Sequence, residues 1–206
     1  EIAAIYMDDA AAKAFLDSFS KRFEALGGKI IASESFEKNA TDVRTQIFKI
    51  KQANPQNVLI LGFPAETGAV LKQSKEIGLD ARFFEGFEVM SDPQVAQIAQ
   101  DAVNGVYNIQ TAAPSGALPG AFAADYSKAY GAAPPYYAAE GYDAVYLYKD
   151  AIKSGLSTER IKAALYATKD FTGASGTLSF DANGDVDKPF EIGQVVDLKL
   201  KRIKTT

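Results

Sequence analysis

The sequence predicts an α/β protein built on a doubly wound parallel sheet. Three short apolar segments, 2–7, 29–36 and 57–63, are each followed by a stretch with helical periodicity. Parallel strands need crossover helices of this kind, because a tight turn cannot join them. The composition fits a folded domain, since 47% of the 206 residues are hydrophobic and 23% are charged.

The first predicted unit is the strand IAAIYM, at 2–7, and an amphipathic helix that ends at the Gly-Gly pair 27–28. Phenylalanine recurs every four residues from Phe15 to Phe23, so these rings share one face of the helix. The second unit is the alternating strand 29–36 and a helix for which Thr41 is the expected N-cap.

The third unit contains the strand NVLILGF, at 57–63, whose continuous apolar character is typical of a strand buried on both faces. The helix 65–78 follows it. A fourth unit is formed by the strand 81–87, a short helix near 93–100 and the strand 105–110. Together these units give a sheet of at least five strands.

The C-terminal half has a different pattern. After a Pro- and Gly-rich linker, helical periodicity marks 119–130, 136–154 and 158–168 with no strand between them, and a hairpin with an Asn-Gly turn is expected over 176–200. Most of the aromatic side chains of 136–154, including Tyr142 and Tyr146, are expected to face a core. These helices need a surface to cover, and no nearby strands provide one.

Composition excludes several classes of function. The chain contains no His and no Cys, which removes the commonest general base, thiolate nucleophiles and zinc ligands. The net charge of −4 and pI near 5.0 argue against nucleic acid and membrane surfaces as partners. Dinucleotide and P-loop phosphate motifs are missing, so we expect no cofactor.

One turn superficially resembles a calcium loop. Asp181, Asn183 and Asp185 occupy the first, third and fifth positions of such a loop. However, Val186 stands where the loop requires Gly, and Ile192 stands where it requires Glu. We therefore expect a plain hairpin turn and no metal site.

Ligands of open parallel sheets bind beyond the carboxyl ends of the strands. This rule selects the loops after the first, third and fourth strands, which bring aromatic and acidic residues together: Asp8, Asp9, Phe63, Glu66, Glu85, Phe87 and Glu88. Such a set suits a small ligand with an amine and an apolar body. The alternative is that the rings belong to the core and the acids stabilise helix starts, and for Glu66 this alternative is favoured.

Tyr136 and Tyr137 are further candidates. They follow a Pro-Pro pair at the entrance of a predicted helix, where a phenol can reach a cleft. The alternative is a packing role, because aromatic residues near helix starts often act as hydrophobic staples.

Several segments together resemble a known family, the solute-binding proteins of branched-chain amino acid type ABC transporters. This extracellular ligand-binding receptor family has the type I periplasmic-binding fold. The segments that carry the resemblance follow the family order and span nearly the whole chain: LGGKIIASESFEKNATDVRTQIFKIKQANPQNVLILG, ETGAVLKQSKEIGL, IAQDAVNGVYN, YAAEGYDAVYLYKDAIKSG and GTLSFDANGDV.

The resemblance implies a two-lobed clamshell that closes over a small solute. By that mapping, residues 1–112 and 173–206 form the second lobe, and 113–172 are the helical remainder of the first lobe. The hinge crossings would lie near 111–118 and 170–176. The first part of the first lobe would be missing from this chain, which explains the helices that lack a sheet to cover.

The resemblance also implies site residues. Phe63 falls where the family places an aromatic residue beside the ligand, and Glu88 falls near the family's carboxylate for the ligand ammonium. Glu85 is the alternative to Glu88, because this loop can be gapped in the alignment. The family often has Tyr-Gly after the first strand of this lobe, where this chain has Ala11 and Ala12. The missing ring would enlarge the pocket, so an aromatic or other carboxylate compound is an alternative to a branched-chain amino acid.

The function implied is solute binding without catalysis, followed by delivery to a membrane ABC permease from a periplasmic or extracellular location. A sensor domain with the same fold is the first alternative, and a carboxylate-based α/β enzyme is the second. The helices over 119–168 are expected to expose an apolar face, which would pair with the missing N-terminal segment or with a second copy of the chain.

Overall fold

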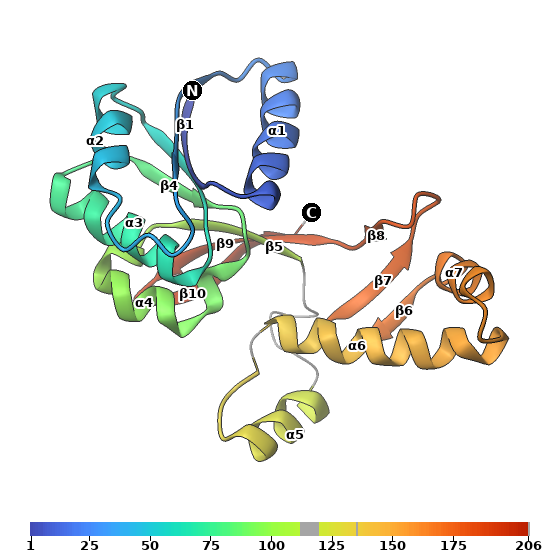
Figure 1. Cartoon of the computed structure of the whole chain (residues 1–206). Helices are drawn as coiled ribbons and strands as arrows, with labels where there is room; N and C mark the ends of the chain where they lie inside the picture. The colour runs from blue at the N-terminus through green and yellow to red at the C-terminus, as the bar shows by residue number, and fades with distance from the viewer. Residues whose placement is uncertain (112–119, 135, 206) are drawn as a thin grey trace. The chain divides into compact units, whose positions relative to one another are not determined.

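The computed structural model describes residues 1–111, 120–134 and 136–205, and it divides the chain into two compact units (Figure 1). The first unit contains Glu1–Gln110 and Glu191–Lys204, and the second contains Thr111–Phe190. The expected first hinge crossing, 111–118, lies outside the described residues from position 112 onward. None of the described helices is long and apolar enough to cross a membrane.

The first unit is built on a seven-stranded sheet with the order β10-β9-β5-β4-β3-β1-β2. The strands β1 to β5 form a continuous parallel set, as predicted. The elements of this unit in chain order are β1 (Ile2–Met7), α1 (Ala10–Ala25), β2 (Ile30–Phe36), α2 (Arg44–Gln52), β3 (Asn57–Leu61), α3 (Pro64–Ile77), β4 (Arg82–Glu85), α4 (Pro93–Ala99), β5 (Tyr107–Thr111), β9 (Phe190–Val196) and β10 (Lys199–Thr205).

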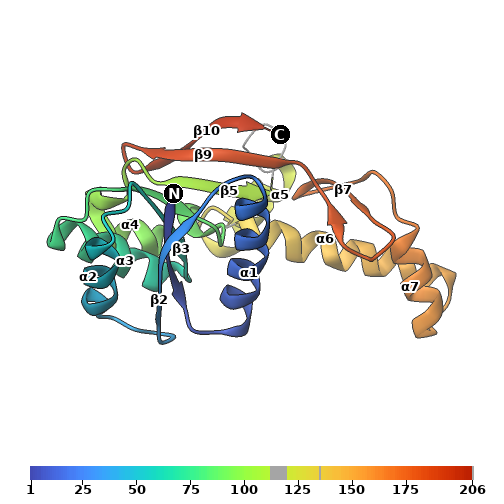
Figure 2. The ribbon, with the colours of Figure 1, turned by 90° about the horizontal axis from the view of Figure 1, so that it is seen from above.

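The sheet is covered on both faces. Figure 2 shows α1 on one side of the strands and α2, α3 and α4 on the other. Such an arrangement follows from right-handed crossovers, because the chain moves from β1 to β2 in one direction and from β3 to β5 in the other. Strand β3 lies near the middle, and its residues 58–61 are all buried, as its continuous apolar sequence predicted.

One helix start differs from the prediction. Thr41 does not cap α2, which begins at Arg44 with Val43 as the N-cap residue and no side-chain cap bond. The carboxylate of Asp42 accepts a hydrogen bond from the backbone N–H of Arg44 at 3.1 Å. Gln73 of α3 holds this turn: its side-chain amide donates to the carbonyl oxygen of Thr41 at 2.7 Å, and its side-chain oxygen accepts from the backbone N–H of Val43 at 2.8 Å.

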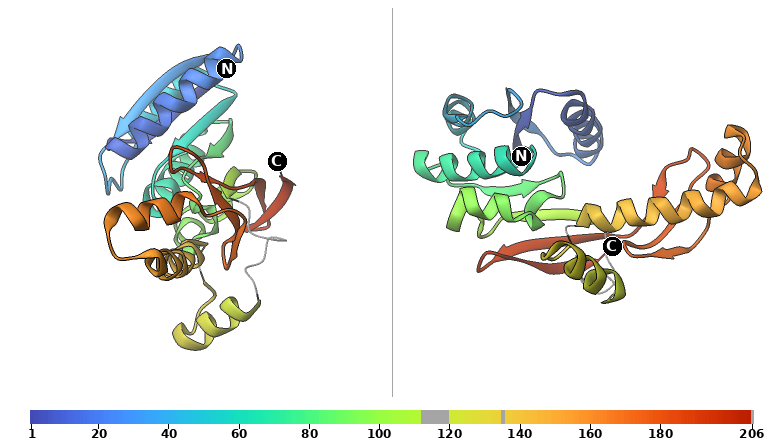
Figure 3. Two further views of the ribbon diagram at one scale, coloured as in Figure 1. Left: turned by 90° about the vertical axis from the view of Figure 1, so that its right-hand side faces the viewer. Right: turned by 60° about the horizontal axis from the view of Figure 1, so that its bottom comes forward.

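The described part of the second unit contains three α-helices and a small antiparallel sheet (Figure 3). The helices are α5 (Gly120–Tyr130), α6 (Tyr136–Ala151) and α7 (Thr158–Tyr166), in agreement with the prediction. The sheet has the order β6-β7-β8, with β6 at Phe171–Gly173, β7 at Gly176–Phe180 and β8 at Val186–Asp187. The Asp181 carboxylate accepts hydrogen bonds from the backbone N–H groups of Asn183 and Asp185, both at 2.8 Å, which organises the expected turn.

The predicted second strand of the C-terminal hairpin is two strands. Of these two strands, β8 pairs with β7, whereas β9 joins the seven-stranded sheet of the first unit. Residues 173–190 therefore lie in the second unit, because β7 remains paired with β6 and β8. The assignment of the two units to lobes of a clamshell remains a prediction.

The expectation that α6 turns most of its aromatic side chains toward a core is wrong for this chain. Tyr142 and Tyr146 are exposed, and so are Val145, at 65%, and Ile152. The hydroxyls of the two tyrosines lie 3.0 Å apart on this open surface. The small sheet of the second unit leaves this face of α6 uncovered, and the predicted apolar face within 119–168 is therefore present.

Gly68 marks a close contact between α3 and α4. A Cβ added to Gly68 would lie 2.8 Å from Cβ of Ile98 and 3.3 Å from the carbonyl oxygen of Val95. Neither atom can move aside without shifting the helix, so Gly68→Ala is expected to lower the free energy of unfolding by about 1–3 kcal/mol in urea denaturation.

A control for this substitution is Gly141→Ala in α6. A Cβ at Gly141 meets no atom within 4 Å, and alanine is the better helix former by roughly 0.5–1 kcal/mol. Gly141→Ala should therefore leave the stability unchanged or raise it. A Gly68→Ala protein as stable as the parent would contradict the tight contact.

Candidate functional site

The candidate site lies where β2, β1, β3 and β4 end. These strands are parallel neighbours, so their carboxyl ends meet at one edge of the sheet. The chain leaves β1 toward β2 and leaves β3 toward β4, which makes the gap between β1 and β3 a topological switch point. Ligands of doubly wound sheets bind at such points, because the loops diverge there and leave a crevice.

The loop after β1 contributes no free carboxylate to this edge. Asp9 caps α1, with its carboxylate accepting a hydrogen bond from the backbone N–H of Ala12 at 2.7 Å. Asp8 forms an ion pair with Lys13 one turn further on. Ala11 is exposed in the first turn of α1, and Ala12 is fully buried. Position 11 therefore offers open space at this edge of the sheet.

Three phenylalanine rings gather beside this space. Phe63, which follows β3, lies with its ring centroid 6.0 Å from that of Phe87, which follows β4. Phe15 of α1 meets Phe87 edge to face at 5.9 Å. Phe63 is 41% exposed and Phe15 is 38% exposed, so these two rings are not core residues, whereas Phe87 is half-buried and packs against the core. An apolar ligand group can pack against them.

The loop after β2 adds a cation. The ammonium of Lys38 lies 5.6 Å from the centre of the Phe63 ring. The next residue, Asn39, donates its backbone N–H to Glu66 at 2.8 Å, and Glu66 is buried. Glu66 therefore anchors the loop after β2, and it lies in the first turn of α3, where the alternative interpretation expected a helix-start charge.

Glu85 ends β4 and is 1% exposed. One carboxylate oxygen accepts a hydrogen bond from the backbone N–H of Phe87. The other oxygen accepts bonds from the backbone N–H of Val89 at 3.1 Å and from the Asn108 side-chain amide at 2.7 Å. Burial raises the pKa of Glu85 to about 7, against the opposing effect of these three hydrogen bonds.

Glu88 lies between the two residues whose N–H groups Glu85 holds. Its backbone has φ of 62°, in the left-handed region that non-glycine residues rarely adopt. Its side chain is partly buried, and its negative charge further raises the pKa of Glu85. The geometry thus separates the two acids: Glu85 turns into the protein, and Glu88 stands on the loop beside Phe87.

Tyr136 and Tyr137 open α6 and belong to the second unit. Tyr137 is 53% exposed, and the side chain of Tyr136 lies outside the described residues. A role for either tyrosine at the site remains a prediction.

Comparison with known proteins decides the family. The model of a family described as periplasmic binding protein matches residues 1–199. The chain belongs to this family. Its fold agrees, because the α/β sheet of parallel strands with covering helices is the type I periplasmic-binding fold that the sequence predicted.

Curated relatives of this periplasmic binding protein cover most of the chain. It is 29% identical over 191 residues to the Leu/Ile/Val-binding protein homolog 1 of Brucella abortus (strain 2308), which covers 92% of the chain and 51% of that protein. It is 32% identical over 173 residues to the leucine-, isoleucine-, valine-, threonine- and alanine-binding protein of Pseudomonas aeruginosa, covering 81% of the chain and 45% of that protein. The chain thus spans about half the length of these relatives.

Solved structures agree with the fold. The branched-chain amino acid transporter substrate binding protein LivJ from Streptococcus pneumoniae, in complex with isoleucine, superposes with a TM-score of 0.82 and 26% identity. The match covers 100% of the present chain and 60% of the LivJ chain.

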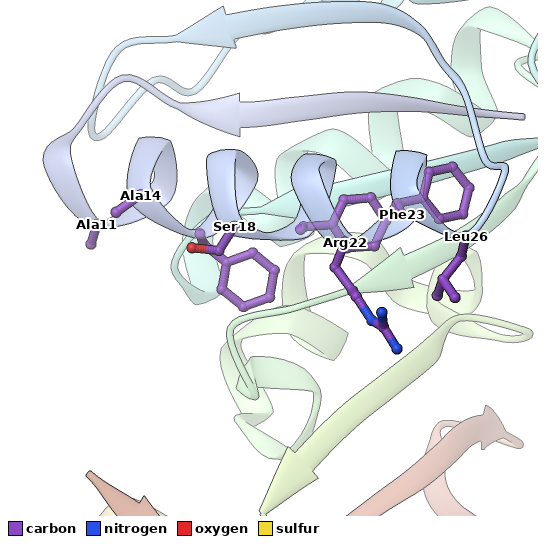
Figure 4. Close-up of a pocket in the computed structure, with 8 residues that line it drawn as sticks. Ala11, Ala14, Ser18, Arg22, Phe23 and Leu26 are labelled. Carbon is purple, nitrogen blue, oxygen red and sulfur yellow. The ribbon is translucent and has the colours of Figure 1, made fainter. Parts of the chain in front are cut away.

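An apolar groove of about 630 Å³ runs along α1 of the binding protein (Figure 4). It begins at Ala11 and continues past Phe15 and Phe23 to Leu26, and Arg22 is the charged residue in its lining. Small-molecule sites combine apolar walls with converging polar groups. This groove has no converging polar groups. Only the end of the groove at Ala11 and Phe15 borders the candidate site.

Sequence reasoning missed three residues of this region. Phe15 has the helical period of a core residue, but its position in the first half of α1 brings it to Phe87. Asn108 is fully buried and donates to Glu85, but β5 also contains the polar residues Gln110 and Thr111, so no sequence signal distinguishes it. Lys38 follows a strand end at the same edge as Phe63, and the rule that selected the other loops could have found it.

Proposed function

We propose that this chain is part of a solute-binding protein that takes up a small amino acid or a related carboxylate and delivers it to a membrane ABC permease from the periplasm or cell exterior. Phe63 and Phe87 would pack on the apolar body of the solute, and Glu88 would accept its ammonium group. The observation that carries the proposal is the pairing of these two rings at a topological switch point, 6.0 Å apart, with an acid adjacent to one of them.

The relatives support the class of solute. Two of them are named for binding branched-chain amino acids, and the LivJ structure contains isoleucine. The small residue Ala11 leaves room beside Phe15, which would suit a larger apolar or aromatic group. Lys38, next to Phe63, could pair with a carboxylate of the solute.

The permease and the completion of the clamshell are part of the same proposal. The two units of the chain would belong to two lobes, with Tyr136 or Tyr137 near the hinge. The exposed apolar face of α6 would be covered by an N-terminal segment or by a second copy of the chain. Native mass spectrometry of the natural gene product, expressed from its own start codon, distinguishes these two alternatives by the mass of the species observed.

Glu88→Ala tests the site. In calorimetric titrations of the natural gene product, this substitution should lower the affinity for leucine or phenylalanine at least tenfold. The reason is that it leaves the buried ammonium group of the solute without its partner. Glu24→Ala, which changes an exposed acid of α1, serves as the control and should leave affinity unchanged.

Benzoate separates the two classes of solute, because it has a carboxylate but no ammonium. A protein that takes an amino acid should bind benzoate weakly, and a protein that takes an aromatic carboxylate should bind it unchanged or more tightly after Glu88→Ala, since a repulsive charge is lost. Amino acid affinity that survives Glu88→Ala would remove Glu88 from the site. Failure to bind any of these compounds would overturn the proposed solute class.

A further inference from the structure

Glu85 holds the loop that carries the proposed ligand groups. We propose that Glu85 is a positioning residue: its buried carboxylate anchors the backbone on both sides of Glu88 and thereby sets the directions of Glu88 and the Phe87 ring. The inference rests on the proposed function, because it assigns a role at that same site. It differs from the sequence-based expectation that Glu85 contacts the solute.

The anchoring is two-sided. Phe87 donates its backbone N–H to one oxygen of Glu85, and Val89 donates to the other oxygen at 3.1 Å. The residue between them, Glu88, has φ of 62°. A non-glycine residue keeps this left-handed conformation only where its surroundings hold it there. The carboxylate of Glu85 holds the 88–89 peptide group, which adjoins Glu88, and the 86–87 peptide group one residue earlier. It therefore restrains the turn in which Glu88 has its unusual conformation.

The anchor is itself fixed from behind. Glu85 pairs in register with Asn108 of β5, whose side-chain amide donates to the second oxygen of Glu85 at 2.7 Å. Asn108 is fully buried, so water does not compete for this bond. A glutamine at position 85 cannot reproduce the arrangement, because one of its two terminal atoms is a donor and would face a backbone N–H.

The protonation of Glu85 follows from its surroundings. On one side β3 presents Ile60, on the other β5 presents the neutral Asn108, and Glu88 on the adjoining loop contributes a negative charge. Burial and this charge raise the pKa of Glu85 to about 7. A protonated Glu85 has one oxygen that donates. The Oδ1 atom of Asn108 has no hydrogen-bond partner among the described residues and can accept a hydrogen bond from this O–H after the amide rotates.

Solute affinity should therefore depend on pH. If the loop is competent only when Glu85 is ionised, the competent fraction falls about tenfold between pH 8 and pH 6, and the affinity falls with it. The direction of the change follows from the pKa of Glu85: the affinity is highest above neutral pH and falls as the pH drops through about 7.

The experiment compares the affinity for leucine, phenylalanine and benzoate at pH 6, 7 and 8 in the natural gene product and its variants. For whichever of these compounds the parent protein binds, Glu85→Gln should lower the affinity about tenfold at pH 8 and remove its dependence on pH. Asn108→Ala should shift the midpoint of the dependence upward, since it removes a donor to the ionised form. Glu191→Gln, at a buried acid of the same unit, should leave the profile unchanged.

A second measurement needs no solute. In ¹⁵N-labelled protein, the amide resonances of Phe87 and Val89 should titrate together with a midpoint near pH 7, and Glu85→Gln should abolish this titration. Binding with an unchanged pH profile in Glu85→Gln, or amides that do not titrate, would overturn the positioning role while leaving the proposed function intact. Joint titration of the amides without binding of any of the three compounds would overturn the proposed solute class and, with it, the role of Glu85 at that site.

Discussion

The unfolding free energy of the parent protein should fall by about 3 kcal/mol relative to that of Glu85→Gln as the pH rises from 4.5 to 7 and above. Glu85 has a folded-state pKa of about 7, against an ordinary value of 4.5. Between these values the folded protein keeps a proton that the unfolded chain has lost, so raising the pH favours unfolding. The rise in pKa corresponds to about 3 kcal/mol at 1.36 kcal/mol per pH unit.

Urea denaturation at pH 4.5, 6, 7 and 8 measures the effect as a difference between the two proteins, which cancels the titration of the other carboxylates. Glu34→Gln, at a partly exposed acid of β2, provides a control whose difference from the parent should show no step near pH 7. Parallel curves for the parent and Glu85→Gln would mean that Glu85 ionises at its ordinary pH in the folded protein.

This prediction and the positioning role support each other physically. A buried ionised carboxylate above pH 7 lowers the stability of the fold, and substitution by a neutral residue would be an easy way to recover it. The three hydrogen bonds of Glu85 all serve the ionised form, and two of them act on the loop that carries Glu88. The negative charge of Glu85 is therefore consistent with a site that must hold Glu88 in one orientation.

The parallel sheet could be predicted from sequence because its signals are local. Strand β3 is apolar at every position from Val58 to Leu61, and all four of these residues are buried. The helices between the strands carry their own periodicity and stop signals, such as the left-handed Gly78 after α3. Each of these signals lies within a few neighbouring residues, so it can be recognised without knowing which distant segment packs on the element.

The parts that could not be predicted depend on distant partners. Glu85 and Glu88 are alike as acids in the sequence. The inward position of Glu85 depends on the side-chain amide of Asn108, 23 residues later, and on two backbone N–H groups of the following loop. The apolar side chains of α6 predict a buried face, but Val145 is exposed because no described part of the second unit covers it. Sequence periodicity identifies which face is apolar and does not identify what packs on it.

Asp143→Ala should produce the largest loss of stability in the second unit. Asp143 is buried in α6, and its two carboxylate oxygens accept hydrogen bonds from the backbone N–H groups of Ala174 at 2.6 Å and Ser175 at 2.7 Å. These bonds tie the helix to the turn between β6 and β7. Alanine would leave two N–H groups without acceptors, at about 1–3 kcal/mol each.

Gly173 shows how close this contact is. A Cβ added at Gly173 would lie 2.3 Å from Cγ of Asp143, so the turn can approach the helix only because residue 173 has no side chain. Hydrogen exchange of the segment 171–180 reports on the contact directly and does not require the two units to unfold together. We expect faster exchange there in Asp143→Ala, by a factor of about 100 or more, which corresponds to about 3 kcal/mol or more.

The matched control for this substitution is Asp150→Ala, which removes an exposed acid two turns further along the same helix. Asp150 pairs with Lys153 at 2.6 Å on the surface, where solvent screens the ion pair, so its loss should change the stability little. If both substitutions changed exchange in 171–180 equally, the effect would come from the helix as a whole. A selective effect of Asp143→Ala would mean that this one buried carboxylate joins α6 to the small sheet.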